Sequence, residues 1–306
     1  MKTDAVFEGG GVRAIAFAGA VCCFEEHGYK WQRIAGTSAG SIVAALLAVG
    51  YTGRELKEII EGLDYLKFMD KGSLQSVPLV GSLLGLLIHK GLNCGNYLEE
   101  WIRGLLKAKG KTKFKDVSVR RQSRLKIIAA DVTRKEILIL PDDLTKYGMD
   151  PMEFEISRAV RMSSSIPFFF NPVHLPYRGG RSFIVDGGIL SNFPIWIFDV
   201  KGIPRWPTIG FRLSECRSQQ REQCKKGILS YALDIAETII DRNDEIYLSD
   251  KDAVRSISIP TFGIKATKFD LTREERQKLY DSGYNKAKEF IGSWNFEKYI
   301  HRYRKR

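Results

Sequence analysis

The sequence is poor in the residues that build metal centres and disulfide frameworks. It has five cysteines in 306 residues and no C-x-x-C pair, and the adjacent Cys22 and Cys23 do not have the spacing of metal ligands. We therefore expect buried free thiols, and we predict neither a metal ion nor a cofactor. Histidine is scarce as well. The four histidines are His27, His89, His174 and His301.

Long apolar runs are also missing. No stretch approaches the roughly 20 apolar residues that a transmembrane helix needs, and the longest candidate, 78–88, is broken by Gly81 and Gly85. Asp4 and Glu8 stand where a signal peptide would have its apolar run. These absences predict a cytoplasmic protein and are compatible with peripheral contact with a membrane.

The remaining composition fits a single α/β domain over residues 1–306. Hydrophobic residues make up 44% of the chain and charged residues 27%, which is enough for a sizeable core. No repeat or linker stands out, and segments of strand type and helix type alternate. The predicted strands are Asp4–Glu8, Gln32–Ala35, Leu125–Ala130, Glu136–Leu140, Phe183–Asp186 and Ile209–Leu213. The predicted helices are Val12–His27, Ser38–Val49, Arg54–Leu63, Tyr97–Lys107, Glu153–Ser163, Gly227–Ile246 and Arg273–Ile291.

The segment Gly36-Thr37-Ser38-Ala39-Gly40 fits the pattern G-x-S-x-G between a predicted strand and a predicted helix. A nucleophilic serine on a sharp strand-to-helix turn has this context, and its flanking glycines relieve the steric clash. The amino terminus of the helix would lie under Ser38, where its N–H groups favour negative charge on a bound oxygen. The alternative is a tight turn in which Ser38 only caps the helix.

Three glycines and an arginine follow the first predicted strand: Gly9, Gly10, Gly11 and Arg13. Without a Cβ to block the approach, the N–H groups of these glycines are able to hold an oxyanion. Arg13 would pin the loop or add positive charge.

The same residues, Gly9 to Ala14, also read G-x-G-x-x-A, a variant of the dinucleotide-binding fingerprint. That fingerprint requires an acidic residue at the end of the second strand. The second predicted strand ends at Gly36 and the serine turn instead. We therefore favour the oxyanion loop.

Asp186-Gly187-Gly188 ends another predicted strand, at the position where α/β folds place their sites. A simple Asp-Gly turn is the alternative. A triad in the α/β-hydrolase order would need a histidine after Asp186, and only His301, in a basic tail, meets that condition. The serine turn also comes too early for that fold. A dyad in which the Asp186 carboxylate activates Ser38 fits better.

Three motifs in this order, G-G-G-x-R, G-T-S-A-G and D-G-G, resemble those of the patatin-like phospholipase family. The segment Ser163–Pro167 resembles the small-residue block of that family, which ends in proline. The match spans residues 5 to about 195. Ala14 departs from it, since the family usually has glycine there, and the predicted helical region 227–306 matches no motif and stays unassigned.

The resemblance implies a three-layer α/β/α fold with a mainly parallel central sheet. It also implies hydrolysis of carboxylic esters of phospholipids or other acyl lipids through a Ser–Asp dyad and an acyl-enzyme intermediate. The positions carried over are Ser38 (nucleophile), Asp186 (general base), Gly9, Gly10, Gly11 and Arg13 (oxyanion loop), Gly36 and Gly40 (elbow), and Gly187 and Gly188 (dyad loop). The alternatives are a soluble esterase or thioesterase with the same dyad, and a non-catalytic interaction protein on the same fold.

The formal net charge is +12, and it is concentrated in Lys107–Lys126 and in the last six residues. Such segments suit an anionic partner, either a membrane surface or nucleic acid, although a solvated face would look the same. The apolar segment 74–88 fits either a flap over an acyl-chain groove or part of the core. We expect an acyl lipid or phospholipid substrate and no nucleic acid partner.

Overall fold

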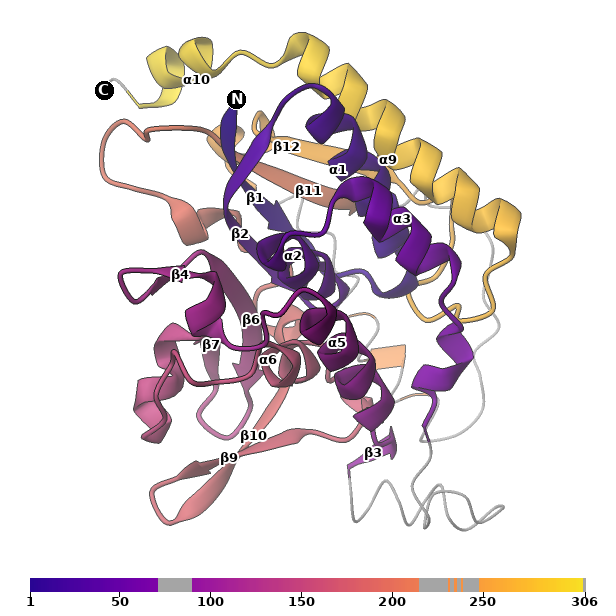
Figure 1. Cartoon of the computed structure of the whole chain (residues 1–306), viewed down its shortest axis with the longest axis vertical. Helices are drawn as coiled ribbons and strands as arrows, with labels where there is room; N and C mark the ends of the chain where they lie inside the picture. The colour runs from indigo at the N-terminus through magenta and orange to yellow at the C-terminus, as the bar shows by residue number, and fades with distance from the viewer. Residues whose placement is uncertain (71–89, 215–230, 232–233, 236–237, 239–247, 305–306) are drawn as a thin grey trace.

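The computed structural model describes residues 1–70, 90–214, 231, 234–235, 238 and 248–304 (Figure 1). The apolar segment 74–88 lies outside the described residues. So does the predicted helix Gly227–Ile246, apart from positions 231, 234, 235 and 238. No helix of the described part is long and apolar enough to cross a membrane.

An eight-stranded sheet forms the centre of the molecule, in the order β12-β11-β1-β2-β6-β10-β9, with β7 paired to β6. The first five strands of this order are parallel, whereas β7, β9 and β10 join the sheet antiparallel. Their bounds are β1 Lys2–Phe7, β2 Lys30–Thr37, β6 Leu125–Asp131, β7 Glu136–Leu140, β9 Val173–Tyr177, β10 Gly180–Asp186, β11 Thr208–Ser214 and β12 Ser256–Pro260. The mainly parallel α/β sheet that the resemblance implies is confirmed.

The parallel strands form because their side chains are buried on both faces. On β1, Ala5 and Phe7 pack into the large core under the helices, while Val6 points to the other face. There Val6 packs with a smaller cluster that includes Ile195 and Phe198. Continuous apolar runs are typical of parallel strands covered on both sides.

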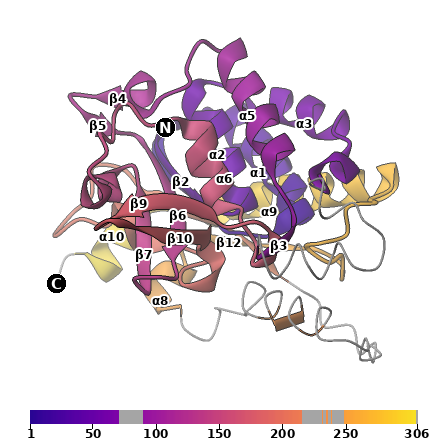
Figure 2. The same ribbon diagram turned by 90° about the horizontal axis from the view of Figure 1, so that it is seen from below.

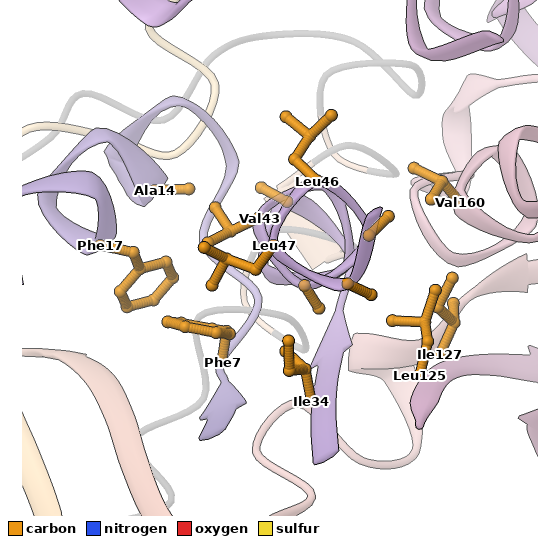
Figure 3. Packing of buried hydrophobic residues seen from close by; sticks show 14 of the residues in the cluster. Phe7, Ala14, Phe17, Ile34, Val43, Leu46, Leu47, Leu125, Ile127 and Val160 are labelled. Atoms are coloured by element: carbon orange, nitrogen blue, oxygen red, sulfur yellow. The ribbon is translucent and has the colours of Figure 1, made fainter. Parts of the chain in front are cut away.

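Most of the helices lie on one face of the sheet, as the view in Figure 2 shows. Their bounds are α1 Ile15–Glu26, α2 Ala39–Val49, α3 Gly53–Glu61, α5 Asn96–Ala108, α6 Ile156–Ser163, α8 Asp250–Ala253, α9 Arg273–Ser293 and α10 Phe296–Tyr303. The central one is α2, which is buried over most of its length and packs above β1, β2 and β6 (Figure 3). Helix α9 packs against α1 and adds Leu279 and Ala287 to the same core. A single domain over the whole chain stays a prediction.

Two predicted helices begin later than expected. Residues Gly11–Ala14 form a 3-10 turn before α1, because Gly11 has a φ of +56° and starts a tighter turn. Helix α6 begins at Ile156 and not at Glu153. The preceding residues pair with the segment around Phe114, whose N–H donates to the Phe154 carbonyl at 3.2 Å.

Candidate active site

Ser38 occupies a sharp turn between the end of β2 and the start of α2. Its φ of 51° and ψ of −129° are unusual for a residue with a side chain, at a cost on the order of 1–3 kcal/mol. The flanking glycines permit the turn. A Cβ on Gly36 would lie 2.3 Å from the Gly40 carbonyl oxygen, and one on Gly40 would lie 2.4 Å from the Glu8 carbonyl oxygen.

The Ser38 hydroxyl donates a hydrogen bond to Asp186 Oδ2 at 2.6 Å. Both side chains are buried, with exposed fractions of 3% and 0%. The other carboxylate oxygen, Oδ1, accepts from the Gly188 N–H at 2.8 Å. Gly187 packs so tightly that a Cβ there would meet the Ile128 carbonyl oxygen at 2.3 Å. The two glycines after Asp186 therefore hold its carboxylate close to the serine turn.

Burial raises the pKa of Asp186 from 3.8 to about 7, although the hydrogen bonds from Ser38 and Gly188 lower it in part. A carboxyl group with this pKa exchanges its proton near neutral pH. That is the property a general base or acid needs at that pH.

The glycine loop lies directly against the serine turn. A Cβ on Gly9 would be 3.1 Å from the Ser38 Cβ. Asn192 holds Gly9 on both sides, since the Gly9 N–H donates to the Asn192 carbonyl at 3.1 Å and Asn192 Nδ2 donates to the Gly9 carbonyl at 3.3 Å. Arg13 is buried and folds back, with Nε donating to the Gly10 carbonyl at 3.1 Å.

The N–H groups of Gly10 and Gly11 donate to no acceptor within the described ranges. Gly11 cannot carry a side chain, because a Cβ there would lie 2.1 Å from the Ala266 carbonyl oxygen. The glycine loop thus has two backbone N–H groups without an acceptor in the described ranges, and they follow Gly9, the loop residue that lies against Ser38.

Within the described part of the chain, no histidine hydrogen-bonds to Ser38 or Asp186. His27 Nδ1 contacts the Cys23 carbonyl at 2.7 Å, and the His174 ring packs on Phe183. Residues 1–70, 90–214 and 248–304 also contain no group of three His, Cys, Asp or Glu side chains that could hold a metal ion.

An apolar cavity of about 400 Å³ lies next to the carboxylate strand. Val185, the residue before Asp186, and Ile189, three residues after it, contribute to its wall. Its other lining residues are Lys90, Val132, Pro167, Phe168, Phe170, Pro172, Phe183 and Ile235.

The basic segment Lys107–Lys126 lies away from this site. Lys111 Nζ donates to the carbonyl of Val49, the last residue of α2. Ser38 precedes the first residue of this 11-residue helix, so the two ends are about 16 Å apart. Five of the nine cations pair with acids elsewhere in the chain: Lys109, Lys113, Lys115, Arg121 and Lys126.

A second set of cations lies at the carboxyl end of the parallel strands, where Ser38 and Asp186 also lie. Strand β10 runs antiparallel to β6, so the β9–β10 turn extends beyond the end of β6. The catalytic-edge cations are Lys90, Lys135, Arg178 and Arg181, all exposed and without an ion pair to the described residues.

Comparison with known proteins gives one family match. The family model for patatin-like phospholipases matches residues 5–199. The uncharacterized protein YqhO of Bacillus subtilis is 38% identical over 301 residues, which cover 97% of this chain and 100% of YqhO. The probable lipid hydrolase 463L of Invertebrate iridescent virus 6 is 27% identical over 205 residues, 62% of this chain and 61% of that protein.

Two solved structures share the fold. VipD from Legionella pneumophila superposes with a TM-score of 0.56 at 17% identity, covering 95% of this chain and 67% of VipD. The type III effector ExoU of Pseudomonas aeruginosa gives a TM-score of 0.51 at 18% identity, covering 94% of this chain and 52% of ExoU. At these identities the likeness concerns the fold alone.

Proposed function

Because the chain belongs to the patatin-like phospholipase family, we propose that it cleaves carboxylic esters of acyl lipids with Ser38 as nucleophile and Asp186 as general base. Family membership supports lipid hydrolysis as the class of activity and confirms the resemblance predicted from the motifs. The assignment of roles to residues depends on one observation above all, the 2.6 Å hydrogen bond from Ser38 Oγ to Asp186 Oδ2.

In the proposed reaction, Ser38 Oγ attacks the ester carbonyl carbon while its proton moves to the Asp186 carboxylate. The tetrahedral intermediate collapses, the alcohol leaves with the proton from Asp186, and the acyl group stays on Ser38. A water molecule then gives its proton to Asp186 and attacks the acyl-enzyme, which releases the carboxylic acid and restores the serine. Each half of the cycle moves one proton onto Asp186 and off again, and a pKa near 7 suits this exchange.

The oxyanion of the intermediate would be held by the N–H groups of Gly10 and Gly11, which have no acceptor within the described ranges. The Ser38 N–H is not available for this role, because it donates to Ser163 Oγ at 2.9 Å. Arg13 acts on the loop through its bond to the Gly10 carbonyl and therefore serves to fix the loop.

The apolar cavity beside Asp186 is suited to an acyl chain, since its wall begins at the residue before the base and is almost entirely apolar. Peripheral contact with a lipid surface would then involve the catalytic-edge cations. They lie at the same end of the sheet as Ser38, whereas Lys107–Lys126 lies near the far end of α2. Lys/Arg near an anionic surface contribute about 1 kcal/mol each.

A fluorophosphonate probe tests the nucleophile. We expect one probe per molecule on the peptide containing Ser38, no labelling of Ser38→Ala, and normal labelling of Ser164→Ala, whose buried hydroxyl has no partner among the described residues. Ser38→Ala should remain folded, because Ser38 makes no side-chain capping bond to α2. Hydrolysis of both a short soluble ester and a phospholipid should be lost together. Normal turnover by folded Ser38→Ala would contradict the assignment.

A further inference from the structure

The two proposed catalytic residues are both held by one short segment at the end of α6. Ser38 and Asp186 are 148 positions apart in the chain. The Ser38 N–H donates to Ser163 Oγ at 2.9 Å, and the Asp186 N–H donates to the Ser165 carbonyl at 2.9 Å. We infer that Ser163 is a positioning residue that sets the Ser38 hydroxyl against the carboxylate. This inference rests on the proposed function.

Ser163 acts at the point where two strands separate. Thr37 and Ile128 form the last register pair between β2 and β6, and β6 continues to Asp131 while β2 turns into the elbow. The Ser163 hydroxyl donates to the Ile128 carbonyl at 2.6 Å and accepts from the next N–H of β2, that of Ser38. The Ser163 hydroxyl thus takes the place of the backbone hydrogen bond between β2 and β6 that is lost where β2 turns away.

This bond completes the restraint on a strained backbone. The Ser38 carbonyl already accepts from the hydroxyl of Ser41 at 2.6 Å and from its N–H at 2.8 Å. With its N–H on Ser163, both backbone polar groups of Ser38 are tied, so φ cannot leave its positive value without breaking a buried bond. Ser163 is 0% exposed, and water has no access to replace its hydroxyl.

The segment itself is fixed from the other side by Arg161. The Arg161 guanidinium is buried, with an exposed fraction of 3%, and donates to Ser165 Oγ. It also donates to the carbonyls of Cys94 at 2.6 Å and Asn171 at 2.8 Å, which belong to two other parts of the chain. Because Arg161 anchors Ser165, a change at Ser163 should move the nucleophile and leave the base in place.

Ser164 provides a matched control within the same turn. It lies between the two contact residues and is buried to a similar degree, with an exposed fraction of 6%. Its hydroxyl, however, has no hydrogen-bond partner in the part of the chain that the structure describes. Loss of a hydroxyl from Ser163 or from Ser164 is the same chemical change, but only Ser163 contacts the backbone of the nucleophile.

The experiment compares Ser163→Ala, Ser163→Cys and Ser164→Ala with the wild type. The measurements are the labelling rate with a fluorophosphonate, kcat and KM for a short soluble ester from pH 5 to 9, and the melting temperature. A displacement of about 1 Å costs on the order of 100-fold in rate. We expect Ser163→Ala to lower labelling and kcat by about 10- to 100-fold, with KM and the pH midpoint unchanged, and Ser164→Ala to stay within about twofold.

Ser163→Cys covers the case in which the alanine variant does not fold, because cysteine fills the space but hydrogen-bonds weakly. It should also lose about tenfold or more in kcat. Folded Ser163 variants with wild-type labelling rates would overturn the inference, as would an equal loss in Ser164→Ala or a shift in pH midpoint in place of a loss in kcat. Labelling of Ser38→Ala at the wild-type rate would instead overturn the proposed function, so the two failures are distinguishable.

Discussion

Replacement of Asp186 by asparagine is expected to abolish ester hydrolysis and, at neutral pH, to stabilise the fold. The side chain is 0% exposed, and burial raises its pKa from 3.8 to about 7. A carboxyl group that holds its proton more tightly when folded contributes stability below pH 3.8, and this contribution is lost as the pH rises through about 7. At about 1.4 kcal/mol per pKa unit, the difference between the two pKa values corresponds to a loss of about 4 kcal/mol in the free energy of unfolding.

Urea denaturation of the wild type and Asp186→Asn across pH 5 to 8 measures this effect. The asparagine does not titrate, and every other ionisable group is common to both proteins. The stability of the variant relative to the wild type should therefore rise by about 2–3 kcal/mol between pH 5 and pH 8. Over the same range, kcat/KM of the wild type should increase with pH, because only the carboxylate accepts the serine proton. If the stability of the wild type and of Asp186→Asn changed equally with pH, a raised pKa of Asp186 would be refuted.

Ser38→Ala is the control for this measurement. It removes a hydrogen bond that lowers the pKa of Asp186, so that pKa should move above its wild-type value. The variant should be inactive and yet keep a pH-dependent stability, with the loss displaced to higher pH. A flat profile in Ser38→Ala would mean that the pH dependence comes from a group other than Asp186.

Three further predictions concern the loop, the surface and the histidines. Gly9→Ala should reduce turnover by 100-fold or more, because the new Cβ would lie 2.2 Å from Asn192 Oδ1, whereas Gly104→Ala, with no atom within 4 Å, should leave kcat unchanged. Glutamate at both Arg178 and Arg181 should weaken co-sedimentation of Ser38→Ala with anionic vesicles at low salt. Charge reversal of Lys107 and Arg120, which are exposed and form no ion pair with residues that the structure describes, should not. Equal vesicle binding by the two double variants would contradict the proposal that the catalytic-edge cations contact the lipid surface. Alanine at any described histidine should retain activity in the soluble-ester assay.

The sequence predicts the elements whose signal is local. Six strands of the sheet follow from apolar runs. Four of them, β1, β2, β6 and β11, are parallel strands, which need such runs because they are buried on both faces. It does not predict β9 or β12, because Val173–Tyr177 and Ser256–Pro260 contain polar residues and prolines typical of edge strands. Helix α6 begins late because residues before Ile156 pair with a distant segment, and propensity carries no information about that pairing.

The site residues divide in the same way. The sequence predicts that Ser38, Asp186 and their glycines form the candidate site, because a strained turn and close backbone approaches restrict which residues are allowed there. The sequence does not identify Asn192 or Ser163 as contacts of these residues. The Asn192 side chain binds Gly9, 183 positions away, and the Ser163 hydroxyl binds Ser38, 125 positions away. Both contacts are to backbone groups of Gly9 and Ser38, which every residue type carries. The serine-rich block Ser163–Pro167 was the available signal, but it does not say which hydroxyl is bonded.

The distribution of charge shows why a run of basic residues is a weak guide to a binding surface. Lys107–Lys126 contains nine cations and one acid in sequence, yet Glu153 alone forms ion pairs with both Lys113 and Lys115. Glu153 lies outside the run, so this pairing appears only after folding. The four catalytic-edge cations are scattered from position 90 to 181, and none forms an ion pair with the described residues. A lipid surface interacts with the net charge of the face that approaches it. On the proposed function, the catalytic-edge cations would therefore draw an anionic interface toward Ser38, whereas five of the nine cations in Lys107–Lys126 are already paired with acids of the same chain.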